Sequence, residues 1–177
     1  MISKKLFTLS WILLCSLFAI AQMPLDPKTG KFKYQEVVHA EGSQQEMFVR
    51  AVSWVNNNYK NAAAVTSVRD PHTGVIEGNH RIQIRLLNKD SIVEVGEMVL
   101  YHFKLQFKEG RYRYTFDKFL VRKQSRFALE QWTEKDSPDY REDQAMIQEI
   151  VDQRISQLIA SLKETMDPKK EKEEEEW

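Results

Sequence analysis

Residues 98–123 constrain the fold most, because they hold two alternating runs of large apolar side chains joined by a turn. Such side chains fill every second position around Glu109-Gly110: Tyr101, Phe103, Leu105 and Phe107 precede the turn, and Tyr112, Tyr114 and Phe116 follow it. Alternation puts neighbouring side chains of a strand on opposite faces, and a glycine turn between two such runs is typical of a β-hairpin. The sequence predicts paired strands over 98–108 and 111–123 with one aromatic face in the core.

Three other segments also have the alternation of strands. They cover residues 31–40, 62–69 and 75–87, and Asp70-Pro71-His72-Thr73-Gly74 provides the turn between the last two. The looser stretch 88–96 has room for a short extra strand, and 124–135 fits neither strand nor helix clearly.

Two segments have helical periodicity. Ser43 and Glu46 form a capping-box signature ahead of an amphipathic run that ends near Tyr59. Ser137-Pro138-Asp139 is a helix-start signal, so we expect a long helix over 139–166. Its apolar stripe recurs at three- and four-residue steps: Ile147, Val151, Ile155, Leu158, Leu162 and Met166. The predicted fold is a two-layer α+β domain, β-α-β4-α, whose antiparallel sheet carries both helices on one face.

The first 21 residues predict export. Lys4 and Lys5 precede an apolar stretch that closes on Ala19-Ile20-Ala21, the order of features in a cleavable signal peptide. The apolar stretch is shorter than the roughly 20 residues of a membrane-spanning helix. We therefore expect a periplasmic or extracellular protein with no membrane span after cleavage. An irregular leader (22–30), a single domain (31–166, including the β-α-β4 unit 31–123) and a charged disordered tail (167–177) follow.

Composition excludes several chemistries. Cys15 is the single cysteine and lies in the predicted signal peptide, so the mature protein has neither a disulfide nor a thiol nucleophile. The formal net charge of zero argues against nucleic acid as a partner. The four histidines are His39, His72, His80 and His102, and their spacing matches no metal motif.

No glycine loop for phosphate and no Gly-x-Ser-x-Gly motif is present. We therefore predict no catalytic residue, metal or cofactor. An enzyme would need a site assembled from scattered polar residues, such as His102 with Asp117 or Ser91.

One predicted surface is strongly basic. If both helices cover one face of the sheet, alternation sends the other strand side chains to solvent: Lys33, Gln35, His39, Arg81, Gln83, Arg85, His102, Lys104, Gln106, Lys108, Arg111 and Arg113. None of these is acidic, and Asp117 is the nearest counter-charge. The preferred contacts for an anionic partner are Arg81, Arg85, Lys104, Arg111 and Arg113, since arginine suits carboxylate and phosphate groups. The alternative is an ordinary solvated face whose positive charge is balanced by the acidic tail.

The sequence also resembles a known family. Residues 30–38 (GKFKYQEVV), 51–55 (AVSWV), 75–78 (VIEG) and 108–116 (KEGRYRYTF) are similar in order and spacing to the secreted bacterial domain of unknown function 4468, which has a TATA-box-binding-protein-like (TBP-like) fold. The resemblance implies that fold and an envelope location, and it carries no activity, because fold does not fix function.

The preferred function is a non-catalytic binding module whose envelope partner is an anionic glycan, a lipid headgroup or a protein. A structural or assembly subunit acting through the C-terminal helix is the alternative, besides the enzyme. The sequence leaves the oligomeric state open.

Export gives the first testable prediction. Replacing Ala19 and Ala21 with bulky residues should block maturation, because a signal peptidase reads small residues at these two positions. Intact-mass measurement of the protein from the envelope fraction checks this. A mass that still includes residues 1–21, or a lipid on Cys15, would contradict cleavage.

Overall fold

The computed structural model describes residues 23–87, 93–122 and 126–168. The predicted signal peptide and most of the charged tail lie outside these residues. The described elements, in chain order, are β1 (Tyr34–His39), α2 (Gln44–Asn58), α3 (Ala62–Val65), β2 (Thr66–Asp70), β3 (Val75–Leu87), β4 (Val93–Lys108), β5 (Arg111–Arg122), β6 (Arg126–Ala128), the 3₁₀ helix η1 (Leu129–Trp132) and α4 (Gln144–Thr165).

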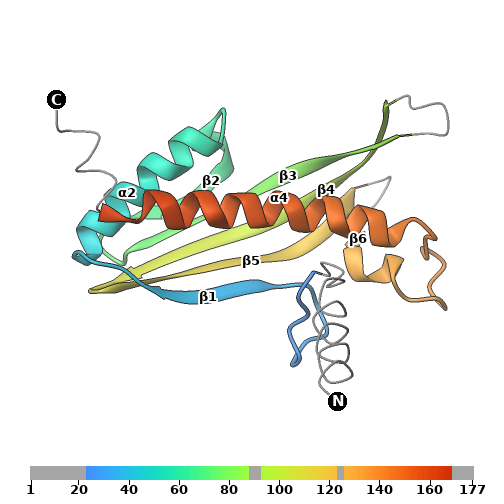
Figure 1. The fold of residues 1–177 in the computed structure, drawn as a ribbon, viewed down its shortest axis with the longest axis horizontal. Coiled ribbons are helices and arrows are strands. Elements are labelled where there is room, and N and C mark those ends of the chain that lie inside the picture. The colour runs from blue at the N-terminus through green and yellow to red at the C-terminus, as the bar shows by residue number, and fades with distance from the viewer. Residues whose placement is uncertain (1–22, 88–92, 123–125, 169–177) are drawn as a thin grey trace, which may run out of the picture.

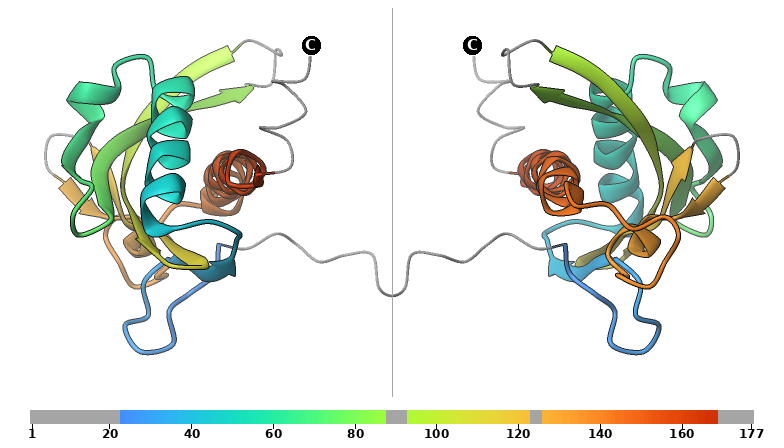
Figure 2. Two further views of the ribbon diagram at one scale, coloured as in Figure 1. Left: turned by 90° about the vertical axis from the view of Figure 1, so that its left-hand side faces the viewer. Right: turned by 90° about the vertical axis from the view of Figure 1, so that its right-hand side faces the viewer.

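The strands form one antiparallel sheet in the order β1-β5-β4-β3-β2, and β6 pairs with β5 beyond the end of β1. Both long helices, α2 and α4, lie on the same side of this curved sheet (Figures 1 and 2). The predicted α+β class and the placement of both helices on one face are confirmed.

The aromatic face of β4 and β5 is the floor of the core. Each apolar residue predicted to alternate on these strands is buried, with Tyr114 the most exposed at 5%. Phe103 stacks on Tyr59 with ring centroids 5.4 Å apart, and Trp54 of α2 packs edge-on against both rings. The α4 stripe is buried above the same sheet, so both helices and the hairpin form one core.

The helix caps explain how α2 is placed. The capping box is formed as predicted: the Glu46 carboxylate accepts from the Ser43 amide at 2.7 Å, and the Ser43 hydroxyl accepts from the Glu46 amide at 3.2 Å. Arg50, which is 5% exposed, donates to the carbonyls of Met166 (2.6 Å) and Glu41 (2.7 Å). It thereby ties α2 to the last turn of α4, whose terminal carbonyls have no helical partner.

Several boundaries differ from the prediction. Residues 62–65 form α3 and not the start of a strand, because alanines favour helix and the Asn61 side chain caps it by accepting from the Ala64 amide at 3.1 Å. Residues 93–96 begin β4 and are not a separate strand. The leader is also less irregular than expected: Leu25 bridges to Phe32, and Met23 is buried in the core.

The last helix begins at Gln144 and not at residue 139, because tertiary contacts hold the preceding segment in turns. The Arg141 guanidinium lies 4.7 Å from the centre of the Trp132 ring and pairs with Glu97 (2.6 Å) and Asp143 (2.5 Å). Residues 124–135, whose sequence fits neither strand nor helix clearly, contain β6 and η1. These two elements place Trp132 for its contact with Arg141.

The packing of Trp54 gives a stability prediction. Trp54→Ala should lower the free energy of unfolding by about 3–5 kcal/mol, because the indole is completely buried between α2 and the sheet. Val49→Ala is the control, since Val49 is on the same helix and 55% exposed, and it should cost less than about 0.5 kcal/mol. Chemical denaturation measures both. Equal midpoints for the two variants would contradict the packing described.

Candidate binding site on the open sheet face

The face of the sheet opposite α2 and α4, here called the open face, carries the predicted polar side chains. Of the predicted cations, Lys104 pairs with Glu77 at 2.9 Å and Lys33 with Asp26 at 3.6 Å. Glu77 lies on β3 in the same alternation as Arg81, so this face carries an acid besides Asp117 that the set of residues predicted for it did not include. The alternation of residues 75–87 indicates this orientation for Glu77 as well, but the predicted open-face residues of this segment began only at Arg81.

A row of charged side chains crosses the middle of the open face. His102 of β4 is 7% exposed, and both of its ring nitrogens face carboxylates. Its Nδ1 lies 2.8 Å from Asp117 of β5, and its Nε2 lies 2.9 Å from Glu77 of β3. The Lys104 ammonium and the His102 ring hold the pKa of Glu77 below its usual value.

A backbone irregularity positions Asp117. Lys118 has φ of 53°, and the β4–β5 register shifts between Leu100 and His102. An extra residue in one strand is a β-bulge, which bends the strand and redirects its side chains. The bulge lets Phe116 and Phe119 both enter the core while Asp117 reaches His102. Sequence reasoning proposed the pairing of His102 with Asp117 but gave no signal for the bulge.

The row is poorly suited to acid–base catalysis. A catalytic histidine needs one ring nitrogen within reach of the substrate. Each ring nitrogen of His102 faces a carboxylate, so neither nitrogen is directed to an open cleft. Ser91, the other residue considered with His102, lies outside the described residues. Among the described residues, no group of three or more histidine, cysteine or carboxylate side chains is arranged to hold a metal ion.

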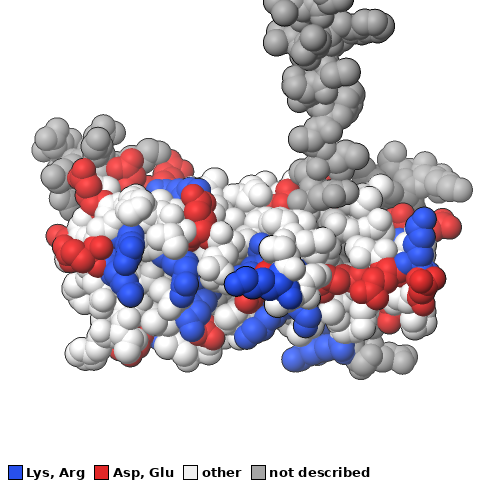
Figure 3. Space-filling model, turned by 90° about the horizontal axis from the view of Figure 1, so that it is seen from below, with Lys and Arg blue, Asp and Glu red and all other residues white. Residues whose placement is uncertain are grey.

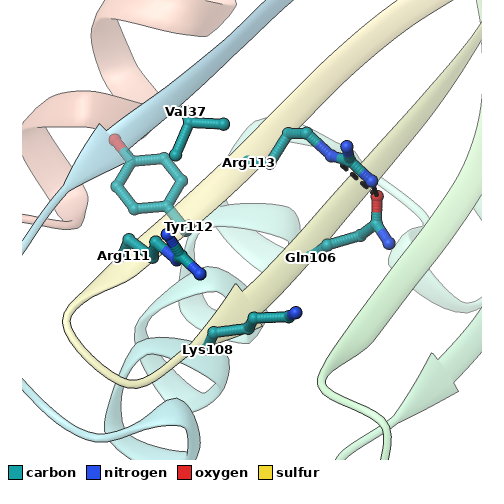
Figure 4. A pocket seen from close by; sticks show the side chains of 6 residues that line it. All are labelled: Val37, Gln106, Lys108, Arg111, Tyr112 and Arg113. Atoms are coloured by element: carbon teal, nitrogen blue, oxygen red, sulfur yellow. Dashed lines mark hydrogen bonds between the residues drawn. The ribbon is translucent and has the colours of Figure 1, made fainter.

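A hollow of about 250 Å³ opens where β1, β4 and β5 meet near the β4–β5 turn (Figure 4). We call it the hairpin hollow, and it is lined by Val37, Gln106, Lys108, Arg111, Tyr112 and Arg113. Strand pairing brings these residues together, since Arg113 lies opposite Val37 on β1 and Gln106 on β4, and Arg111 lies opposite His39 and Lys108.

The charge of the hairpin hollow is not compensated within the described part of the chain. Lys108, Arg111 and Arg113 are exposed, no acidic side chain lines the hollow, and none pairs with these cations in the described ranges. The Arg113 guanidinium donates to the neutral amide oxygen of Gln106 at 2.6 and 3.1 Å, which orients it without neutralising it (Figure 4). Figure 3 shows Lys and Arg gathered in the middle of the face seen from below, with Asp and Glu mostly toward its ends.

Tyr112 borders the hollow from within the sheet. Its hydroxyl points toward α4, and it is buried without a hydrogen-bond partner among the described residues. Burial, together with the nearby Glu36 carboxylate, raises the pKa of Tyr112 to about 12. The hydroxyl is therefore neutral, and the ring belongs to the aromatic core face behind the three cations.

The five predicted contacts do not form one site. Arg111 and Arg113 meet at the hairpin hollow, whereas Lys104 is in the ion pair with Glu77. Arg81 lies opposite Leu100, and Arg85 lies opposite Val95 near the far end of β3. Lys108, absent from the predicted contacts, joins the hollow because the turn at 109–110 sets the register. No helix in the described ranges is long and apolar enough to cross a membrane.

Comparison with known proteins identifies a family. The model described as a domain of unknown function (DUF4468) with TBP-like fold matches residues 34–122, the span from the start of β1 to the end of β5. The chain is similar to a TBP-like protein from Parabacteroides distasonis (TM-score 0.65, 15% identity), covering 81% of this chain and 96% of that one. It is also similar to a DUF4468 family protein from Bacteroides ovatus (TM-score 0.65, 14% identity, 80% and 90% covered). No curated protein matches. At these identities the solved structures show the fold alone, and the family match confirms the resemblance found in the sequence.

The charged row gives a second stability prediction. His102→Leu should lower the free energy of unfolding by roughly 1–3 kcal/mol, because Glu77 and Asp117 lose their shared partner in a partly buried position. Adding Glu77→Gln and Asp117→Asn should recover part of the loss. The exposed His39→Leu is the control, and urea denaturation measures all three. If His102→Leu is as stable as the parent, the row contributes nothing to the fold.

Proposed function

The chain belongs to the family of domains of unknown function (DUF4468) with TBP-like fold, and on that premise we propose that it is an exported, non-catalytic binding module whose hairpin hollow holds the carboxylate or phosphate group of an envelope ligand. The observation that carries the proposal is the cluster of Lys108, Arg111 and Arg113 around one hollow without an acidic counter-charge in its lining. The sequence features of residues 1–21 support export.

The geometry favours a ligand over an ordinary solvated surface. Like charges on neighbouring strands repel each other. A sheet face that binds no ligand therefore usually has acidic side chains among its basic ones. The middle of the open face follows this pattern, since Glu77 and Asp117 accompany Lys104 and His102. The hollow departs from this pattern at Lys108 and Arg111, which lie directly opposite each other.

The chemistry of the lining favours an oxyanion. An arginine guanidinium presents paired N–H groups that match two oxygens of a carboxylate or phosphate. The Gln106 amide oxygen binds one edge of the Arg113 guanidinium. Arg111 lies on the same face of β5, two residues before Arg113. Val37, which is 50% exposed, adds an apolar side to the hollow. A small anionic group on a larger glycan or lipid fits these features.

The two alternatives have less support. An enzyme built on His102 would need a ring nitrogen free of its two carboxylates. An assembly subunit acting through α4 would need the apolar stripe of that helix, which is buried in the chain's own core at 0–1% exposure from Ile147 to Met166.

Arg111→Gln with Arg113→Gln tests the proposal. The double variant should fold normally and bind a glucuronate oligosaccharide, or vesicles containing phosphatidylglycerol, about tenfold or more weakly, since two charge-assisted contacts are lost. Arg122→Gln with Arg126→Gln is the matched control, because it removes the same charge at the other end of β5. Titration calorimetry at low salt measures the glycan, and vesicle co-sedimentation measures the lipid. Equal weakening in both double variants would show attraction by net charge alone, and the proposal would fail.

A further inference from the structure

The upper edge of β3 is unpaired over most of its length. β2 pairs with residues 75–78 only, and the last register pair is Thr66 with Gly78. Beyond it, no strand of the described ranges pairs with residues 79–87 on the side away from β4. In Figure 1, β3 continues past β2 toward the upper right with no neighbouring strand on that side.

The chain turns away from this edge for a definite reason. Asn61 caps α3, and the short helix places the Val65 carbonyl against β3. A Cβ added to Gly78 would lie 2.3 Å from the Val65 oxygen, so the backbones already touch there. Strand β2 therefore begins only at Thr66, opposite Gly78. The position beside the following residues of β3 is left open.

A groove of about 690 Å³ adjoins that open position. It is bordered by Lys60 and Asn61 of the α2–α3 connection, His80 and Arg81 of β3, Leu100 of β4 and Arg154 of α4, and no acidic residue lines it. Lys60, Arg81 and Arg154 are exposed and have no ion-pair partner in the described part of the chain. Burial lowers the pKa of His80, and the nearby Arg81 and Arg154 lower it further.

We propose that the free edge of β3 binds an extended acidic peptide segment of another protein as an added strand, with its carboxylates against Arg81, Arg154 and Lys60. An unpaired strand edge presents a row of N–H and C=O groups that a peptide backbone can satisfy, and the side chains beside it set specificity. The cations select acidic residues. This site is separate from the hairpin hollow and does not depend on the function proposed for it.

A second copy of this chain suits the edge poorly. Two copies joined through β3 would bring Arg81 and Arg85 of each into the same small sheet, and like charges on neighbouring strands are destabilising. Charge complementarity therefore favours an acidic partner of different sequence.

The test uses a fluorescein-labelled nine-residue peptide of threonine and glutamate with the glutamates in adjacent pairs, so that both faces of the added strand carry carboxylates. Binding should protect residues 79–87 from hydrogen–deuterium exchange, since the added strand covers their backbone amides. A peptide with proline at its centre, or with lysine for every glutamate, should bind at least about tenfold more weakly, because each removes a backbone donor or the charge match. Fluorescence polarisation gives the affinities.

Arg81→Glu with Arg154→Glu should weaken peptide binding by about tenfold or more, while Arg122→Glu with Arg126→Glu is the matched charge control. Arg111→Gln with Arg113→Gln should leave peptide binding unchanged, which separates this site from the hairpin hollow. Unaltered binding in the Arg81/Arg154 variant, or protection outside 79–87, would overturn the proposal. So would protection of 79–87 without peptide together with a doubled solution mass, because a second copy would then occupy the edge.

Discussion

The aromatic face of β4 and β5 must be kept from water, and the other elements are arranged around that requirement. Burial of apolar area is the main favourable term in folding, and Phe103 at the centre of this face touches rings from α2 and β5. Covering the face takes two helices. Alternation then sends every intervening side chain of the strands to the opposite face, so the polar open face is a direct consequence of the aromatic one.

Both basic surfaces occur where strand pairing stops. The hairpin hollow lies where β1, β4 and β5 reach the sheet's end together, and the groove lies where β2 falls short of β3. Within the paired interior, cross-strand neighbours neutralise each other, as Glu77 does Lys104. In the hairpin hollow, Arg111 and Arg113 have cross-strand neighbours on both sides, but none of these neighbours is acidic. At the edge of β3, Arg81 has a strand neighbour on one side only.

The sequence predicted the elements well and their junctions poorly. Local signals were sufficient for the β4–β5 hairpin and for the Ser43–Glu46 cap, because the interacting residues are close in the chain. The predicted start of α4 was wrong, because Arg141 is held in a turn by contacts with Glu97 and Trp132, which local signals do not reveal. Likewise, alternation placed Lys108, Arg111 and Arg113 on the open face, but it did not indicate that they line one hollow with Val37 of β1. The bulge at Lys118 has no sequence signal, since a lysine with positive φ is uncommon.

The position of α4 after all the strands of the sheet has a consequence for folding. Its stripe from Ile147 to Met166 closes the core, and Arg50 and Tyr34 find their partners in it more than a hundred residues later in the chain, at separations of 116 and 118 residues. Without this helix, α2 alone covers the aromatic sheet face, and the positions that the α4 stripe fills are open to water. The fold is therefore completed late, and its rate is set by contacts between distant segments.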